Sequence, residues 1–101
     1  MNKLFLEEKH KKIIKEILEK YNYDFFAFGS RVKGNHHKFS DLDLFYKDPI
    51  PLKIISNIEE EFEESDLPFT VDLVNYNACD SDFQLIMLKH CIKIDMFNIL
   101  N

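Results

Sequence analysis

The stretch FFAFGSRVKGNHHKFSDLDLFY, residues 25–46, decides the fold of this chain. It begins within an apolar run, residues 24–28, that stops at Gly29, which predicts a short strand ending in a turn. It closes on residues 41–46, whose side chains alternate between two faces with the period of two that is typical of a strand. The stretch therefore predicts two neighbouring strands joined by a compact connection.

The connection between these strands predicts a short helix followed by a loop. Ser30 is a favoured N-cap residue and Gly34 a favoured terminator, so residues 30–34 are expected to be helical. A strand that runs through Gly29 into a helix leaves the first N–H groups of the helix unpaired, and Gly29 lets a ligand come close to the backbone. This turn therefore predicts an anion site suited to phosphate oxygens.

Five flanking segments complete the expected order αβαβαβαβ. They are helices at residues 4–21, 51–64 and 82–91, the last capped by Asp80 or Ser81, and strands at 69–75 and 92–97. Residues 92–97 fit a strand better than a continued helix. A helix links the second and third strands, which predicts a parallel pair, whereas the short link between the first two permits a reversal. The expected fold class is α/β, a small mixed sheet with helices mainly on one face.

Length and charge restrict the function. The 101 residues have room for a single domain, residues 1–101. The net charge is −5, and residues 51–101 carry ten acidic residues against three basic ones, so non-specific nucleic-acid binding is not expected. No apolar run approaches the ~18 residues that span a membrane, and the first residues do not read as a signal peptide. Cys79 and Cys91 lack zinc-site spacing, so we expect reduced thiols in a cytoplasmic protein.

Three aspartates carry the expected chemistry. On a strand, Asp41 and Asp43 project from one face about 6.5 Å apart, which suits two carboxylates that share divalent cations. Asp72 lies within an apolar strand, where a carboxylate needs a partner or a metal. If its strand lies beside residues 41–46, Asp72 joins the same cluster. Such a triad fits two-metal transfer at the α-phosphorus of a triphosphate, with Asp72 also able to take the proton of the acceptor.

The segments GSRVKG at 29–34, SDLDL at 40–44 and VDL at 71–73 together resemble the minimal nucleotidyltransferases of the DNA polymerase β superfamily. The resemblance implies the polymerase β-like nucleotidyltransferase fold, with Mg²⁺ or Mn²⁺ as cofactor and ATP as substrate. It implies catalytic and metal-binding roles for Asp41, Asp43 and Asp72. It also implies nucleotide binding by Gly29, Ser30, Arg31 and Ser40.

Members of that family with this size are often antitoxins paired with a HEPN-domain RNase toxin, and some add AMP to a tyrosine of the toxin. The resemblance therefore implies a protein acceptor for this chain. A small-molecule acceptor and a non-catalytic antitoxin that blocks its partner stay open as alternatives. Arg31 and Lys33 either offset the charge of the triphosphate or pair with carboxylates.

Overall fold

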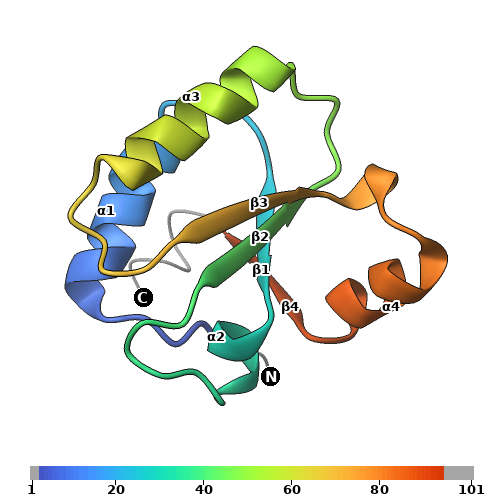
Figure 1. Ribbon diagram of the computed structural model, residues 1–101, viewed down its shortest axis with the longest axis horizontal. Coiled ribbons are helices and arrows are strands. Elements are labelled where there is room, and N and C mark those ends of the chain that lie inside the picture. The colour runs from blue at the N-terminus through green and yellow to red at the C-terminus, as the bar shows by residue number, and fades with distance from the viewer. Residues whose placement is uncertain (1–2, 95–101) are drawn as a thin grey trace.

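The computed structural model describes residues 3–94, in which four strands form one sheet with helices around it (Figure 1). The strands are β1 (Phe25–Phe28), β2 (Leu42–Tyr46), β3 (Val71–Asn75) and β4 (Cys91–Ile94). The helices are α1 (Glu8–Leu18), α2 (Ser30–Lys33), α3 (Leu52–Glu63) and α4 (Ser81–Lys89), with a 3₁₀ turn, η1 (Tyr76–Ala78), after β3. Within residues 3–94 no helix has both the length and the apolarity that crossing a membrane requires.

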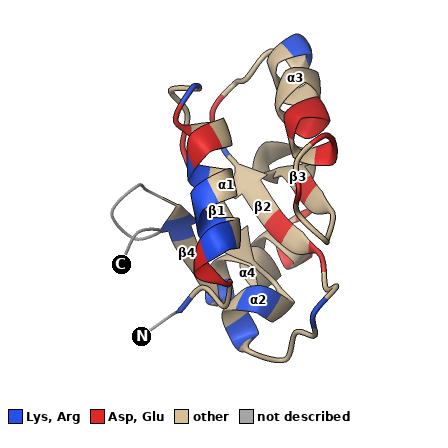
Figure 2. Cartoon of the chain, turned by 90° about the vertical axis from the view of Figure 1, so that its left-hand side faces the viewer, with Lys and Arg blue, Asp and Glu red and all other residues tan. Residues whose placement is uncertain are grey.

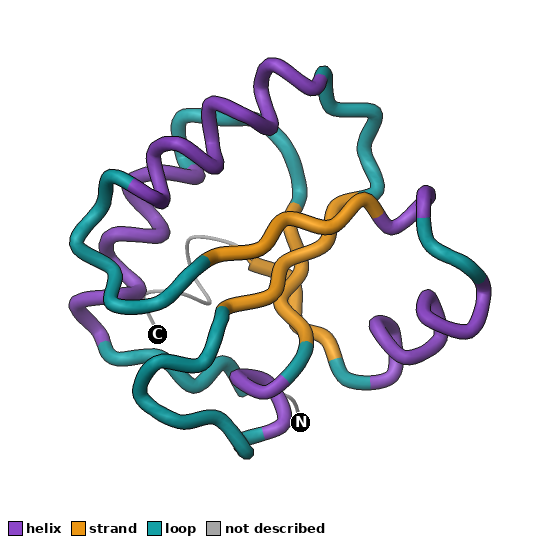
Figure 3. Tube along the Cα trace, viewed as in Figure 1, coloured by secondary structure: helices purple, strands orange, loops and turns teal. Residues whose placement is uncertain are grey.

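The sheet has the strand order β3-β2-β1-β4 and is mixed, as the sequence predicts. β1 pairs antiparallel with both β2 and β4. The link through α2 and the loop after it reverses the chain between β1 and β2. β2 and β3 are parallel, and α3 makes the crossover between them. Figure 3 shows this crossover helix and α1 lying on the same side of the strands.

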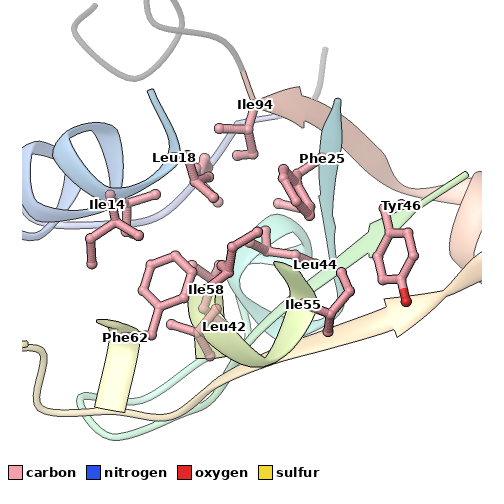
Figure 4. Close-up of a cluster of buried hydrophobic side chains, with 14 of the residues drawn as sticks. Ile14, Leu18, Phe25, Leu42, Leu44, Tyr46, Ile55, Ile58, Phe62 and Ile94 are labelled. Atoms are coloured by element: carbon pink, nitrogen blue, oxygen red, sulfur yellow. The ribbon is translucent and has the colours of Figure 1, made fainter. Parts of the chain in front are cut away.

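One face of the sheet packs against α1 and α3 and forms the main core (Figure 4). Leu42 and Leu44 of β2 point into it and are completely buried, as are Ile14 of α1 and Ile58 of α3. Each such side chain contributes about 1.5–3 kcal/mol through burial, so this face stabilises most of the small domain. Period-2 alternation then turns the intervening residues of β2 to the other face.

The opposite face is covered only in part, by α4. Phe45 of β2 and Met87 of α4 are completely buried there, and Phe28 of β1 is buried beside them. The Phe26 and Phe45 rings are stacked with centroids 4.9 Å apart. Asp43 shares this face with Phe45, two residues along β2, so the strand carries its carboxylate on the side away from α1 and α3.

The structure corrects the predicted bounds of several elements. Residues 4–7 are not helical, because the Phe5 N–H donates to the Arg31 carbonyl at 2.8 Å and holds this segment against α2. The third strand begins at Val71 rather than at residue 69. Helix α4 ends at Lys89, and Cys91 opens β4 instead of closing the helix.

Of the two cap residues proposed for α4, Asp80 is the one that caps it, accepting from the Phe83 N–H at 2.8 Å. The predicted fourth strand, residues 92–97, is present in its first part, and residues 95–97 lie outside the described range.

Candidate active site

The parallel register of β2 and β3 places two of the predicted aspartates next to each other. Asp43 and Asp72 are direct Cα partners in this register. In a parallel ladder such partners project from the same face, so both carboxylates lie on the side away from α1 and α3. Their side chains are close enough to share a hydrogen bond. The structure therefore brings Asp43 and Asp72 together across the strand pair.

Asp43 is the half-buried member of this pair, whereas Asp41 and Asp72 are exposed. Partial burial, followed by the charges of Asp72 and Asp41, raises the pKa of Asp43 from 3.8 to about 6. The repulsion shows that Asp41, just before the start of β2, is within electrostatic range of the pair. Among residues 3–94, however, no three His, Cys, Asp or Glu side chains already surround one metal position.

The backbone turn after β1 lies directly against this pair. Gly29 has φ +83°, and a Cβ built on it would come within 2.5 Å of Asp43 Oδ2. Any other residue would both strain the backbone and displace the carboxylate. Because Phe28 is the Cα partner of Asp43 in the antiparallel register, the sheet itself fixes this close approach. Gly29 is therefore required by geometry at this position.

Helix α2 starts immediately after Gly29. The N–H groups of Val32 and Lys33 both donate to the Gly29 carbonyl, at 3.1 and 3.0 Å. The N–H groups of Ser30 and Arg31 precede the first bonds of the helix, and the half-buried Ser30 adds a hydroxyl. This corner offers hydrogen-bond donors a short distance from carboxylates, which is the arrangement that a metal-bound phosphate group needs.

The Arg31 side chain is held by backbone carbonyls of three other residues. This side chain is buried, and it donates from Nε to the Ser40 carbonyl at 3.0 Å, from Nη1 to the Phe5 carbonyl at 3.1 Å and from Nη2 to the Lys38 carbonyl at 3.2 Å. Its guanidinium also lies over the Phe69 ring, 4.1 Å from the centroid. The predicted contact of Arg31 with nucleotide stays a prediction, and these contacts give the side chain a structural role. Arg31 positions the loop before β2.

Ser40 belongs to the same loop. Its Oγ accepts the His37 N–H at 2.8 Å and its carbonyl accepts from Arg31. Ser40 thus holds the backbone in place immediately before Asp41. Its predicted contact with nucleotide stays a prediction.

The described residues fit a divalent cation by their chemistry. Three carboxylates supply the hard oxygen ligands that Mg²⁺ and Mn²⁺ prefer. Burial and then the charges of Asp72 and Asp41 raise the pKa of Asp43, and a cation between Asp43 and Asp72 would offset that repulsion. Asp41 would complete the ligand set.

Comparison with known proteins decides the family. The family model described as "Polymerase beta, Nucleotidyltransferase" matches residues 11–95. The chain belongs to this nucleotidyltransferase family. It is 42% identical over 86 residues to a Haemophilus influenzae protein named "Probable protein adenylyltransferase MntA", across 81% of this chain and 75% of that protein. The nucleotidyltransferase assignment made from the sequence motifs is therefore confirmed.

A solved structure supports the same fold. A chain described as "Crystal structure of the toxin-antitoxin with AMP-PNP" superposes on this one with a TM-score of 0.62. The two chains are 18% identical, and the match covers 89% of this chain and 78% of the other. The predicted nucleotidyltransferase fold is confirmed.

The apolar surface of α4 was not predicted as a feature of the site. Leu85, Ile86 and Leu88 are all exposed. The sequence contains a signal for it, since the segment FQLIML at residues 83–88 is apolar around most of the helix instead of along one stripe. A helix packed on a single sheet face cannot bury every such side chain.

The charge of Asp43 predicts a pH dependence of stability for the metal-free protein. The pKa of Asp43 is raised to about 6 in the folded state, so the protonated carboxyl adds to the free energy of unfolding below pH 3.8. This stabilisation is lost as the pH rises through 6. Asparagine does not ionise, so Asp43→Asn is expected to abolish this loss of stability with rising pH. The free energy of unfolding at pH 7 should rise by about 1–2 kcal/mol, after allowance for solvent screening. Urea unfolding of both proteins from pH 4 to 7 in EDTA measures the difference. Parallel pH profiles would contradict the assigned repulsion.

Proposed function

We propose that this chain transfers AMP from ATP to a tyrosine hydroxyl of a HEPN-type RNase toxin and so acts as its antitoxin. The observation that carries the proposal is the pairing of Asp43 with Asp72 directly in front of the Gly29 turn. Acidic groups and the N–H donors that we propose to bind phosphate thus lie within one small area of the sheet. Mg²⁺ or Mn²⁺ is the proposed cofactor.

The proposed reaction joins the acceptor oxygen to the α-phosphorus of ATP and breaks the bond from that phosphorus to the bridging oxygen, so pyrophosphate leaves. Gly29 and Ser30 hold the phosphate tail through backbone N–H groups and the hydroxyl. Exposed Asp72 accepts the proton that the acceptor hydroxyl loses. A divalent cation held by Asp41, Asp43 and Asp72 would neutralise the charge that builds on the phosphate oxygens.

The open side of the sheet at Asp43 and Asp72 and the charge of the chain favour a protein acceptor over a small molecule. The described residues form one sheet with its covering helices, and the Asp43–Asp72 face is not enclosed by a further substrate domain within residues 3–94. Acidic residues follow one another along the C-terminal part of α3 (Figure 2), within a half of the chain that is strongly acidic. This net negative charge would steer a basic RNA-binding protein toward the chain as a whole.

The relatives support the same acceptor class. The Haemophilus influenzae relative is named as a protein adenylyltransferase, and the structural neighbour is a toxin–antitoxin with an ATP analogue. An added AMP group would place negative charge at the RNase centre and repel RNA phosphates. One covalent event would therefore silence the toxin. The proposal includes a cytoplasmic location, where ATP and both proteins are available.

The direct test is to incubate the purified protein with a HEPN-type toxin encoded beside it, ATP and Mg²⁺, and to measure the intact mass of the toxin. We expect a gain of one or more AMP groups on a tyrosine and parallel loss of RNase activity. The control omits Mg²⁺ and adds EDTA. A toxin that gains no mass but is inhibited at a stoichiometric ratio would favour the non-catalytic antitoxin, and AMP transfer to a small molecule alone would favour the small-molecule enzyme.

A further inference from the structure

A surface cavity of about 400 Å³ opens beside Asp41, at the end of the sheet where β2 and β3 begin. Three aromatic side chains line it: Phe39, Phe62 and Phe69. Phe62 and Phe69 are buried, whereas Phe39 is 60% exposed although it is a large apolar residue. A cavity with such walls can enclose the apolar stem of a ligand and can contact a cation through the faces of its rings.

The charged residues that line this cavity are all acidic. They are Asp41, just before β2, and Glu59 and Glu63 of α3. Glu59 and Glu63 lie one helical turn apart, so their charges repel each other. Within residues 3–94 none of the three forms an ion pair, whereas other carboxylates, such as Glu8 and Glu19, pair with lysines. The cavity therefore carries negative charge that the described part of the chain does not neutralise.

Two basic side chains contact the aromatic walls without entering the cavity. The Arg31 guanidinium lies over the Phe69 ring, but three backbone carbonyls hold it in place. The Lys38 Nζ lies 5.4 Å from the centroid of the Phe39 ring. Both basic residues line a second cavity, beside the N-terminal segment, and neither lines this one. The described residues thus place cations against two of the rings but none among the three carboxylates.

The lining of the cavity excludes two classes of ligand. A triphosphate would be repelled by the carboxylates, and its proposed site at the Gly29 turn lies on the β1 side of β2, whereas the cavity borders β3. A bare metal ion does not fit the cavity, because within residues 3–94 no three acidic, His or Cys side chains surround one position. An organic cation with an apolar stem fits both the charge and the walls. Lys and Arg side chains have this character.

The cavity adjoins the position that we propose for the acceptor. Thr70 and Val71 line it, and the next residue along β3 is Asp72. At the strand rise of about 3.3 Å per residue, Asp72 follows within about 7 Å of this lining. Asp72 is the proposed base for the acceptor hydroxyl. A basic side chain in the cavity and a hydroxyl at Asp72 can therefore belong to one polypeptide.

We propose that this cavity binds a Lys or Arg side chain of the acceptor protein and so selects a hydroxyl that has a basic residue beside it. The proposal rests on the proposed function, since it assumes that the acceptor hydroxyl belongs to a protein. The carboxylates pair with the cationic head, and the aromatic walls cover its methylene stem. Bound in this way, the acceptor segment is held on the β3 side of the site, across β2 from the Gly29 turn. A second copy of this chain is a poorer occupant, because its net charge is −5.

The test replaces Glu59 and Glu63 together by glutamine, which keeps the side-chain size and the helix propensity but removes the charge. The matched control is Glu60→Gln/Glu64→Gln. Glu60 and Glu64 are exposed, have the same spacing at the end of α3 and do not line the cavity. Each variant removes two negative charges, so long-range steering changes equally in both.

The toxin that tests the proposed function serves as the acceptor, and its AMP content is measured by intact mass. In Glu59→Gln/Glu63→Gln we expect kcat/KM for the toxin to fall at least about tenfold, mainly through KM, and in the control to stay within about twofold. The Kd for ATP in Mg²⁺, measured by calorimetry, is expected to stay unchanged in both variants. Melting curves establish that both proteins are folded.

A second measurement identifies the occupant. Each Lys and Arg of the toxin near the modified tyrosine is replaced by Gln, one at a time. One replacement is expected to reproduce the loss with the wild-type enzyme and to add no further loss with Glu59→Gln/Glu63→Gln. Additive losses for every replacement would show that no such side chain occupies the cavity.

Other results would also overturn the cavity proposal. One is wild-type kcat/KM in Glu59→Gln/Glu63→Gln, and another is an equal fall in the Glu60→Gln/Glu64→Gln control, which would reveal a general charge effect. A wild-type dimer that dissociates in Glu59→Gln/Glu63→Gln without toxin, measured by light scattering, would assign the cavity to a second copy. A wild-type protein that binds ATP but modifies no toxin would instead contradict the proposed function, and the cavity proposal with it.

Discussion

Replacing Asp41 and Asp43 together by asparagine is expected to lower AMP transfer by at least about 10²-fold while the fold stays intact. Asparagine keeps the size of each side chain but removes the negative charge that would hold a divalent cation. Asp43 is also the carboxylate that faces Asp72 across the strand pair, so its charge matters most. Because the two aspartates repel one another in the metal-free protein, the double variant should unfold at the same or a higher temperature.

The matched control for this variant is Asp66→Asn. Asp66 is exposed beyond α3, in the turn that leads to β3, and is not part of the predicted site. It tests whether the loss of any surface carboxylate affects transfer. Initial rates for the three proteins, with melting curves recorded in EDTA, separate catalysis from folding. A double variant as active as the Asp66→Asn protein would exclude Asp41 and Asp43 as the metal site.

Gly29→Ala is expected to reduce AMP transfer by about 10²-fold, although it adds only one methyl group. The φ of +83° already disfavours alanine by about 1 kcal/mol. The new Cβ would also come within 2.5 Å of Asp43 Oδ2, so either the turn or the carboxylate must move. Both belong to the predicted site, and a shift of about 1 Å in either one disturbs the positioning of the phosphates.

Gly34→Ala provides the comparison that separates strain from site geometry. Gly34 has φ +88°, so the conformational cost is similar, but its Cβ would meet the Phe5 ring at 3.3 Å and no carboxylate. We expect a similar loss of stability for the two variants and near wild-type transfer for Gly34→Ala, measured at a temperature where both are folded. Equal losses of activity would show that Gly29 acts through the stability of the turn alone.

The sequence predicts the sheet and the face on which Asp43 lies because their signals are local. The alternation over residues 41–46 sets which face Leu44 and Asp43 occupy, and the structure agrees. The short link before β2 indicated the reversal that makes the sheet mixed. The neighbouring positions of Asp43 and Asp72 required one further assumption, that their strands pair, and the crossover through α3 made that pairing reasonable.

The backbone contacts of Arg31 could not be predicted, because they join segments that are distant in the sequence. Its guanidinium is satisfied by carbonyls of Phe5, Lys38 and Ser40, which no local pattern brings together. The contact of Phe5 with Arg31 explains why residues 4–7 are not helical although their pattern continues that of α1. In both places tertiary hydrogen bonds override a local preference.

The measurement that tests the account most directly is the affinity of the protein for ATP with and without divalent cation. Calorimetry with ATP in Mg²⁺ and in EDTA should show binding that requires the metal and that is lost in Asp43→Asn but kept in Asp66→Asn. Metal-dependent binding with this pattern would place the triphosphate at the Gly29 turn beside Asp43 and Asp72. Equal binding in EDTA, or unchanged binding by Asp43→Asn, would contradict the carboxylate site on which the proposed transfer depends.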